Sequence, residues 1–168
     1  PFQIVMGGKA HPRDHEGKQL IQHIHRVAKT LKEVIPIVFL ENYDVAQARQ
    51  LIGGCDIWLN TPLRPYEASG TSGMKAAING VANLSVLDGW WIEGCVEGKT
   101  GWAIGSDSPS ENGNDALSLY QKLEQQVLPM YHEHKPEWIQ MMKTCIQKNG
   151  TYFNTHRMMR RYVCEAYL

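Results

Sequence analysis

The segment from Glu67 to Lys75 combines residue types suited to binding a phosphorylated carbonyl compound. It contains a carboxylate, three hydroxyls, two glycines and a lysine. Pro62 and Pro65 disfavour helix before it, and the small polar residues that follow predict a helix start that runs on to Ile78. The free amides of a first helical turn lie at the positive end of the helix dipole. We therefore expect an anion, most plausibly phosphate, to bind there.

Lys75 lies about one turn into this predicted helix, so its amine could reach a carbonyl on a ligand held by its phosphate. An imine-forming amine beside a phosphate site indicates pyridoxal 5'-phosphate as the cofactor. The predicted cofactor-binding residues are Lys75, Thr71, Ser72 and Gly73. A solvated surface lysine and simple helix-capping residues are the alternatives at these positions.

Short apolar runs that alternate with amphipathic stretches predict the elements around this junction. Strands are expected at residues 2–6, 37–40, 57–59 and 83–87. Apolar residues between Leu20 and Leu31 recur at helical spacing, and a second helix over residues 45–52 should end at Gly53 and Gly54. Alternating strands and helices imply an α/β fold with a parallel sheet and a ligand site at the carboxyl ends of the strands.

We expect one domain over residues 1–168. Its α/β core should occupy residues 1–87, and residues 88–112 should form an irregular, glycine-rich connection with a short strand near Trp102. Helical patterns follow within residues 113–168, at 115–130, 136–147 and 155–167. The chain opens directly on a strand with proline as its first residue, which we interpret as the start of a fragment.

Composition excludes several classes of function. The 168 residues are 43% hydrophobic and 20% charged, as in an ordinary globular protein, and the formal net charge is zero. This balance argues against nucleic acid or an anionic membrane as the main partner. Four separated cysteines without a CxxC pair favour reduced thiols in a cytoplasm. No metal site is expected, because the histidines of each close pair face apart on a helix.

The same residues closely resemble a known family. Glu67 to Lys75, continued to Gly80 and by Leu87-Asp88-Gly89, is similar to the cofactor-lysine segment of the α-glucan (glycogen, starch, maltodextrin) phosphorylases. The resemblance extends over nearly the whole chain and includes Gly7 to Ala10 with Pro12 and His15, Phe39 to Tyr43, Trp90-Trp91 and Gly101 to Gly105. The last two segments resemble the shorter bacterial and archaeal branch.

This resemblance implies a fold and an activity. The fold would be the doubly wound, Rossmann-like C-terminal domain of a two-domain glycosyltransferase of the GT-B type. The whole enzyme would catalyse reversible phosphorolysis of α-1,4-glucan, with retention, to glucose 1-phosphate. Its partners would be phosphate, glucan and a missing N-terminal domain of the same polypeptide, and a homo-oligomer is compatible with it. Without that domain the fragment is expected to be inactive.

The resemblance also assigns roles to residues. Lys75 anchors the cofactor, and Glu67 with the amides of Ser69 and Gly70 holds hydroxyls of the transferred glucosyl unit. Tyr43 lies beside the cofactor. The next family position is often basic in long-form members, whereas Asp44 here disfavours phosphate contact at that position.

Two other functions stay open. One is a nucleotide-sugar-dependent glucan synthase domain, a retaining glycosyltransferase. Such enzymes often carry two glutamates at a fixed spacing, and Lys75 stands where the second would be after Glu67, which favours the phosphorylase. The other is a non-catalytic module that binds glucan or a protein partner.

Overall fold

The computed structural model describes residues 2–105 and 114–168. The chain groups into two compact units, Pro1–Leu51 and Ile52–Leu168. Both contain parallel strands connected by helices, which confirms the predicted α/β class with parallel pairing. The assignment of residues 1–168 to one domain stays a prediction. Within the part of the chain that the structure describes, no helix is long and apolar enough to cross a membrane.

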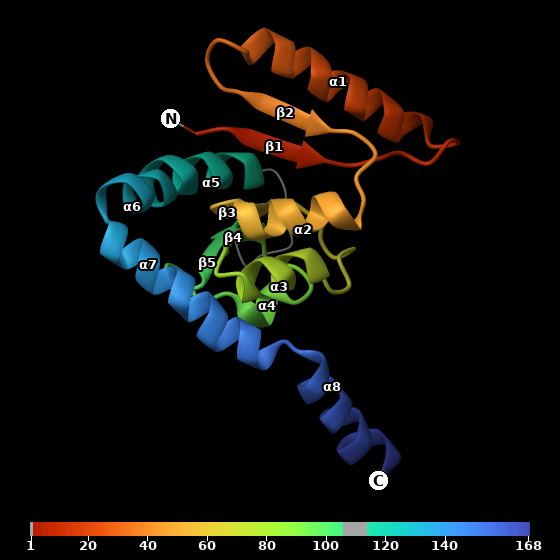
Figure 1. The fold of residues 1–168 in the computed structure, drawn as a ribbon, viewed down its shortest axis with the longest axis vertical. Coiled ribbons are helices and arrows are strands. Elements are labelled where there is room, and N and C mark those ends of the chain that lie inside the picture. The colour runs from red at the N-terminus through yellow and green to blue at the C-terminus, as the bar shows by residue number, and fades with distance from the viewer. Residues whose placement is uncertain (1, 106–113) are drawn as a thin grey trace. The chain divides into compact units, whose positions relative to one another are not determined.

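The first unit is a βαβ arrangement (Figure 1). Strands β1 (Ile4–Gly7) and β2 (Ile37–Leu40) pair in parallel, with Ile4 opposite Ile37. Helix α1 (His15–Leu31) connects them and lies alongside β2, where the ring of His25 meets the edge of Phe39 at 5.5 Å. The Asp14 carboxylate caps α1 by accepting a hydrogen bond from the Gly17 amide at 2.8 Å.

Helix α2 (Val45–Gly54) carries the chain from the first unit into the second. In the second unit, strands β3 (Ile57–Asn60), β4 (Ala82–Val86) and β5 (Gly101–Ile104) form a parallel sheet in the order β3-β4-β5. The central strand β4 is buried at every residue, as expected for a strand covered on both faces. Helix α3 (Thr71–Ile78) connects β3 to β4, and the short α4 (Trp91–Gly94) follows β4.

Helices α5 to α8 form the C-terminal part of the chain (Figure 1). The three predicted helical stretches are confirmed, but each contains a π-helical turn that periodicity did not predict. The order is α5 (Asp115–Lys122), a π turn (Leu123–Val127), α6 (Leu128–Glu133), α7 (Lys135–Thr144), a π turn (Cys145–Gly150), α8 (Thr155–Tyr162) and a π turn (Val163–Tyr167).

The core of the second unit joins the sheet to these helices. Trp91 and Trp102 are its largest fully buried side chains, and Trp138 of α7 packs near Trp102. The π turn at Cys145–Gly150 contacts α3, so the sheet and the C-terminal helices together hold α3 in place. Strand β5 confirms the short strand predicted near Trp102, whereas α4 lies in a stretch expected to be irregular. Residues 106–112 of that stretch lie outside the described residues.

Candidate functional site

The candidate site begins where the loop after β3 enters α3. Gly70 precedes the helix in the left-handed region, at φ 84°, a conformation that side chains other than glycine rarely adopt. No side chain caps α3. The Gly73 amide donates to the Gly70 carbonyl at 3.2 Å, whereas the amides of Thr71 and Ser72 donate to no acceptor among the described residues. Along that turn Thr71 is exposed, Ser72 is half-buried and Gly73 is buried.

Lys75 shares a face of α3 with Thr71. The two residues are four apart, and a helical side chain leans towards the N-terminus of its helix, so Lys75 leans towards the first turn. The Lys75 side chain is exposed, and among the described residues none forms an ion pair with it. A free primary amine therefore lies next to an uncapped helix start.

Two contacts hold the first turn of α3 against the sheet. The indole Nε1 of Trp58 in β3 donates a hydrogen bond to Ser72 Oγ at 3.2 Å. The side-chain amide of Asn83 in β4 donates to the Gly73 carbonyl at 3.2 Å. A Cβ atom on Gly73 would lie 2.6 Å from Asn83 Oδ1 and 2.9 Å from the indole nitrogen of Trp90. Glycine at position 73 thus permits close packing, in addition to any role in binding a ligand.

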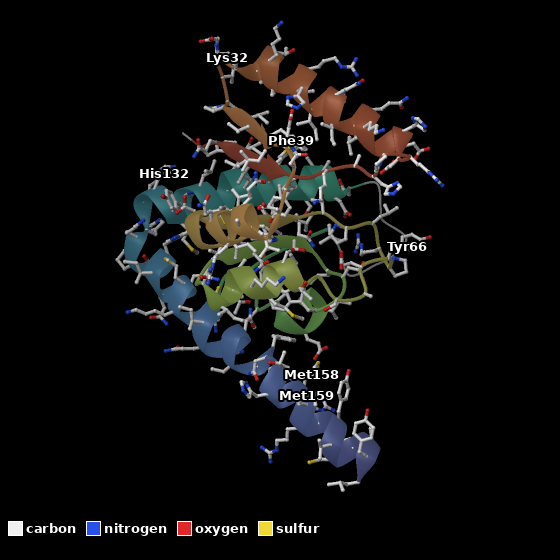
Figure 2. All side chains as sticks on the ribbon, turned by 45° about the vertical axis from the view of Figure 1, so that its right-hand side comes forward. Lys32, Phe39, Tyr66, His132, Met158 and Met159 are labelled. Carbon is white, nitrogen blue, oxygen red and sulfur yellow. The ribbon has the colours of Figure 1, made fainter. Side chains whose placement is uncertain are left out.

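Glu67 lies on the same junction, before α3. Its backbone amide donates to Oδ2 of Asp88 at 3.0 Å, while its half-buried carboxylate accepts no hydrogen bond from any described residue. The neighbouring Ser69 carbonyl accepts a hydrogen bond from the Trp90 amide at 2.8 Å. Figure 2 labels the preceding residue, Tyr66, whose side chain points away from the ribbon and is 80% exposed.

The structure therefore places Glu67, Ser69, Gly70, Thr71, Ser72, Gly73 and Lys75 on one loop and helix start in the second unit. Tyr43 follows β2 in the first unit, and its ring lies over Gly7, where an added Cβ would be 2.5 Å from Tyr43 Cδ2.

Comparison with known proteins decides the family. The sequence profile of the carbohydrate phosphorylases matches residues 1–101. The chain belongs to the carbohydrate phosphorylase family.

Named relatives agree with this family over almost the whole chain. A maltodextrin phosphorylase from Thermococcus litoralis is 49% identical over 172 residues, which cover 99% of this chain and 21% of the relative. Glycogen phosphorylases from Aquifex aeolicus and Mycobacterium tuberculosis are 46% and 44% identical, again over 99% of this chain and over 25% and 20% of their own lengths. The chain thus spans about a fifth to a quarter of the length of these three relatives.

Sequence reasoning missed two contacts of the candidate site, those made by Asp88 and Trp58. Asp88-Gly89 after a strand predicts a turn, but nothing in the spacing connects Asp88 to the Glu67 amide. A tryptophan near the end of a predicted strand, such as Trp58, indicates core packing or stacking on a sugar, not a hydrogen bond to Ser72. Trp90, Trp91 and Trp102 are buried in the core.

The buried Cys145 and the partly buried Cys55 are not activated nucleophiles. Burial raises the pKa of Cys145 to about 12, and the Cys145 thiol donates to the Thr100 carbonyl at 3.3 Å. Burial also raises the pKa of Cys55. Both thiols therefore keep their protons at neutral pH.

Proposed function

We propose that this chain is the cofactor-bearing part of an α-glucan phosphorylase that binds pyridoxal 5'-phosphate at Lys75. The observation that carries the proposal is the shared, exposed face of Thr71 and Lys75 at the uncapped start of α3, in a chain of the carbohydrate phosphorylase family. The reaction would be the attack of inorganic phosphate on the terminal α-1,4-linked glucosyl unit, with retention, to release glucose 1-phosphate.

The start of α3 fits the phosphate of the cofactor. The Thr71 and Ser72 amides and the helix dipole favour an anion, and the exposed Thr71 hydroxyl adds a donor. Because Ser72 Oγ accepts the indole proton of Trp58, the Ser72 hydroxyl proton can be donated to a phosphate oxygen. Gly73 has no side chain to bind the phosphate, and its role would be to let the first turn pack closely against Asn83.

Lys75 would hold the carbonyl end of the cofactor covalently. Its amine carries no competing ion pair among the described residues, so no bond has to be broken before it reacts. When bound, the cofactor would supply a phosphate group with a pKa near neutrality, suited to general acid catalysis beside the substrate phosphate. Lys75 is then an anchor and not a nucleophile towards the sugar.

Glu67, Ser69 and Gly70 would bind the glucosyl unit. The Glu67 carboxylate, which has no partner among the described residues, can accept hydrogen bonds from sugar hydroxyls, and charge-assisted bonds of this kind are strong. The amides of Ser69 and Gly70 would add donors on the same loop.

Further contributions would come from outside this loop. The family resemblance would place Tyr43 beside the cofactor, and an N-terminal domain of the same polypeptide would complete the cleft for glucan. Cys55, Cys145 and Cys164 form no disulfide among the described residues, which supports a cytoplasmic location.

The test uses the full-length polypeptide, incubated with pyridoxal 5'-phosphate, reduced with borohydride and mapped by peptide mass spectrometry. We expect the label on Lys75 and release of glucose 1-phosphate from glucan and phosphate. Lys75→Arg should abolish the label and the activity, whereas Lys99→Arg, at another exposed lysine, should change neither. A label on other lysines with Lys75 spared would refute the cofactor site. Binding of a nucleotide sugar without phosphorolysis would indicate a glucan synthase instead.

A further inference from the structure

The carboxylate of Asp88 is buried, and each of its oxygens accepts a hydrogen bond. Asp88 is 7% exposed, and its two oxygens accept hydrogen bonds from two backbone amides. Oδ2 accepts from Glu67 at 3.0 Å, and Oδ1 accepts from Gly89 at 2.9 Å. A carboxylate removed from water needs such partners, so its burial ties two stretches of chain together.

A second contact joins the same two stretches. The Trp90 amide donates to the Ser69 carbonyl at 2.8 Å. Gly89 lies between the two bonds at φ 53°, and a Cβ there would be 2.5 Å from the Ser69 oxygen and 2.9 Å from the Glu67 oxygen. The backbones therefore approach more closely than any side chain allows.

These bonds act on a loop without helix or strand of its own. Residues 61–70 contain only turns and bends, so the direction of the Glu67 side chain depends on what holds its backbone. The loop backbone is held at two points: the Glu67 amide donates to Asp88, and the Ser69 carbonyl accepts from the Trp90 amide. Neither bond involves Thr71, Ser72 or Lys75.

We propose that Asp88 is a positioning residue that orients Glu67 towards the glucosyl unit. This inference rests on the proposed function. Asp88 touches neither sugar nor cofactor in the proposal. It acts through the Glu67 amide, and therefore it should affect sugar transfer while leaving cofactor binding intact.

The test is a double-mutant cycle in the full-length polypeptide. Asp88→Asn keeps the shape of the side chain but turns an NH₂ group towards one of the two amides, which loses its acceptor. We expect kcat/KM for phosphorolysis to fall about 5- to 100-fold, mainly through kcat, with normal cofactor content. In a Glu67→Gln background the same change should cost little, because the group that Asp88 orients is already impaired.

A matched control separates positioning from stability. Thr100 is fully buried, and its Oγ1 also makes two backbone bonds, accepting from Val96 at 2.8 Å and donating to Gly94 at 2.9 Å. Thr100→Val should lower the melting temperature about as much as Asp88→Asn and leave kcat/KM unchanged. Equal kinetic losses in both variants, or independent losses for Asp88→Asn and Glu67→Gln, would overturn the inference.

Hydrogen exchange gives a readout that does not depend on activity. The Glu67 amide should exchange faster in Asp88→Ala, which removes both acceptor oxygens, than in wild type and in Thr100→Val. Unchanged exchange at Glu67 would refute the positioning role even in an active enzyme. If the wild-type polypeptide neither forms the Lys75 adduct nor releases glucose 1-phosphate, the proposed function fails, and this inference fails with it.

Discussion

The indole nitrogen of Trp58 donates a hydrogen bond to the hydroxyl oxygen of Ser72 at 3.2 Å. This bond connects β3 to the first turn of α3 and fixes the rotamer of a hydroxyl that we propose to bind phosphate. Because the indole N–H can only donate, Ser72 Oγ must be the acceptor in this bond. The hydroxyl proton then remains available to a ligand.

Removing that donor should weaken cofactor binding without unfolding the site. Trp58→Phe keeps an aromatic ring but loses the N–H group, so Ser72 must be ordered by the ligand itself. We expect the Kd for pyridoxal 5'-phosphate to rise about 3- to 10-fold. An absorbance titration before borohydride reduction measures it. Ser72→Ala should show a similar loss, and the double variant should be no worse than either single variant, since both remove one interaction. Additive losses would contradict this account.

Glu67→Gln should slow sugar transfer. The amide keeps the shape of the carboxylate but weakens charge-assisted bonds to sugar hydroxyls, so kcat/KM in the full-length enzyme should fall about 30- to 1000-fold. Cofactor content should stay normal because Lys75 and the start of α3 are untouched. A glutamate that only stabilised a turn would give the opposite result, a lower melting temperature with near-wild-type kinetics.

Gly73→Ala should destabilise the protein although alanine is the better helix former. The new Cβ would lie 2.6 Å from Asn83 Oδ1, and Asn83 is buried and already bonded to the Gly73 carbonyl. We expect a loss of about 1–3 kcal/mol in the free energy of unfolding, measured by urea denaturation. Gly54→Ala is the matched control, since an added Cβ there meets no atom within 4 Å. Equal stability of the two variants would show that the packing at Gly73 can relax.

Cys145 should make stability fall at high pH. Burial raises its pKa from 9.0 to about 12, so between these values the unfolded chain loses a proton that the folded chain retains. The unfolded state is then favoured, and the free energy of unfolding should fall by about 1.4 kcal/mol per pH unit from this thiol alone. Below pH 9 the thiol contributes no pH dependence. Comparing wild type with Cys145→Ala isolates the effect, and a stability difference that stays constant from pH 8 to 11 would disprove it.

Much of the fold could be predicted because it depends on local pattern. The strand at residues 37–40 and the helix start before Lys75 follow from apolar runs, prolines and small polar residues, and the structure has both. The π turns could not be predicted, because a widened turn keeps nearly the same apolar face and depends on packing. Trp138 is buried before the turn at Cys145–Gly150, and Cys145 is buried at its first position.

The candidate site also has a part that the sequence could predict and a part that it could not. Glu67, Thr71, Ser72 and Lys75 could be found because they are neighbours in the sequence. The bonds from Asp88 and Trp58 could not, since they depend on which strand ends meet and on the direction of each side chain. Periodicity predicts which face of a strand is buried, but not which hydroxyl an indole will reach.

The hydrogen bonds that shape the candidate site have short separations along the chain. They join residues 14, 10 and 21 positions apart, from Trp58 to Ser72, from Gly73 to Asn83 and from Glu67 to Asp88. Loops of this length close with a small entropic cost, and low contact order favours fast folding. The stretch from β3 to α4 can therefore form its hydrogen bonds locally during synthesis, before the more distant helices of the unit have left the ribosome.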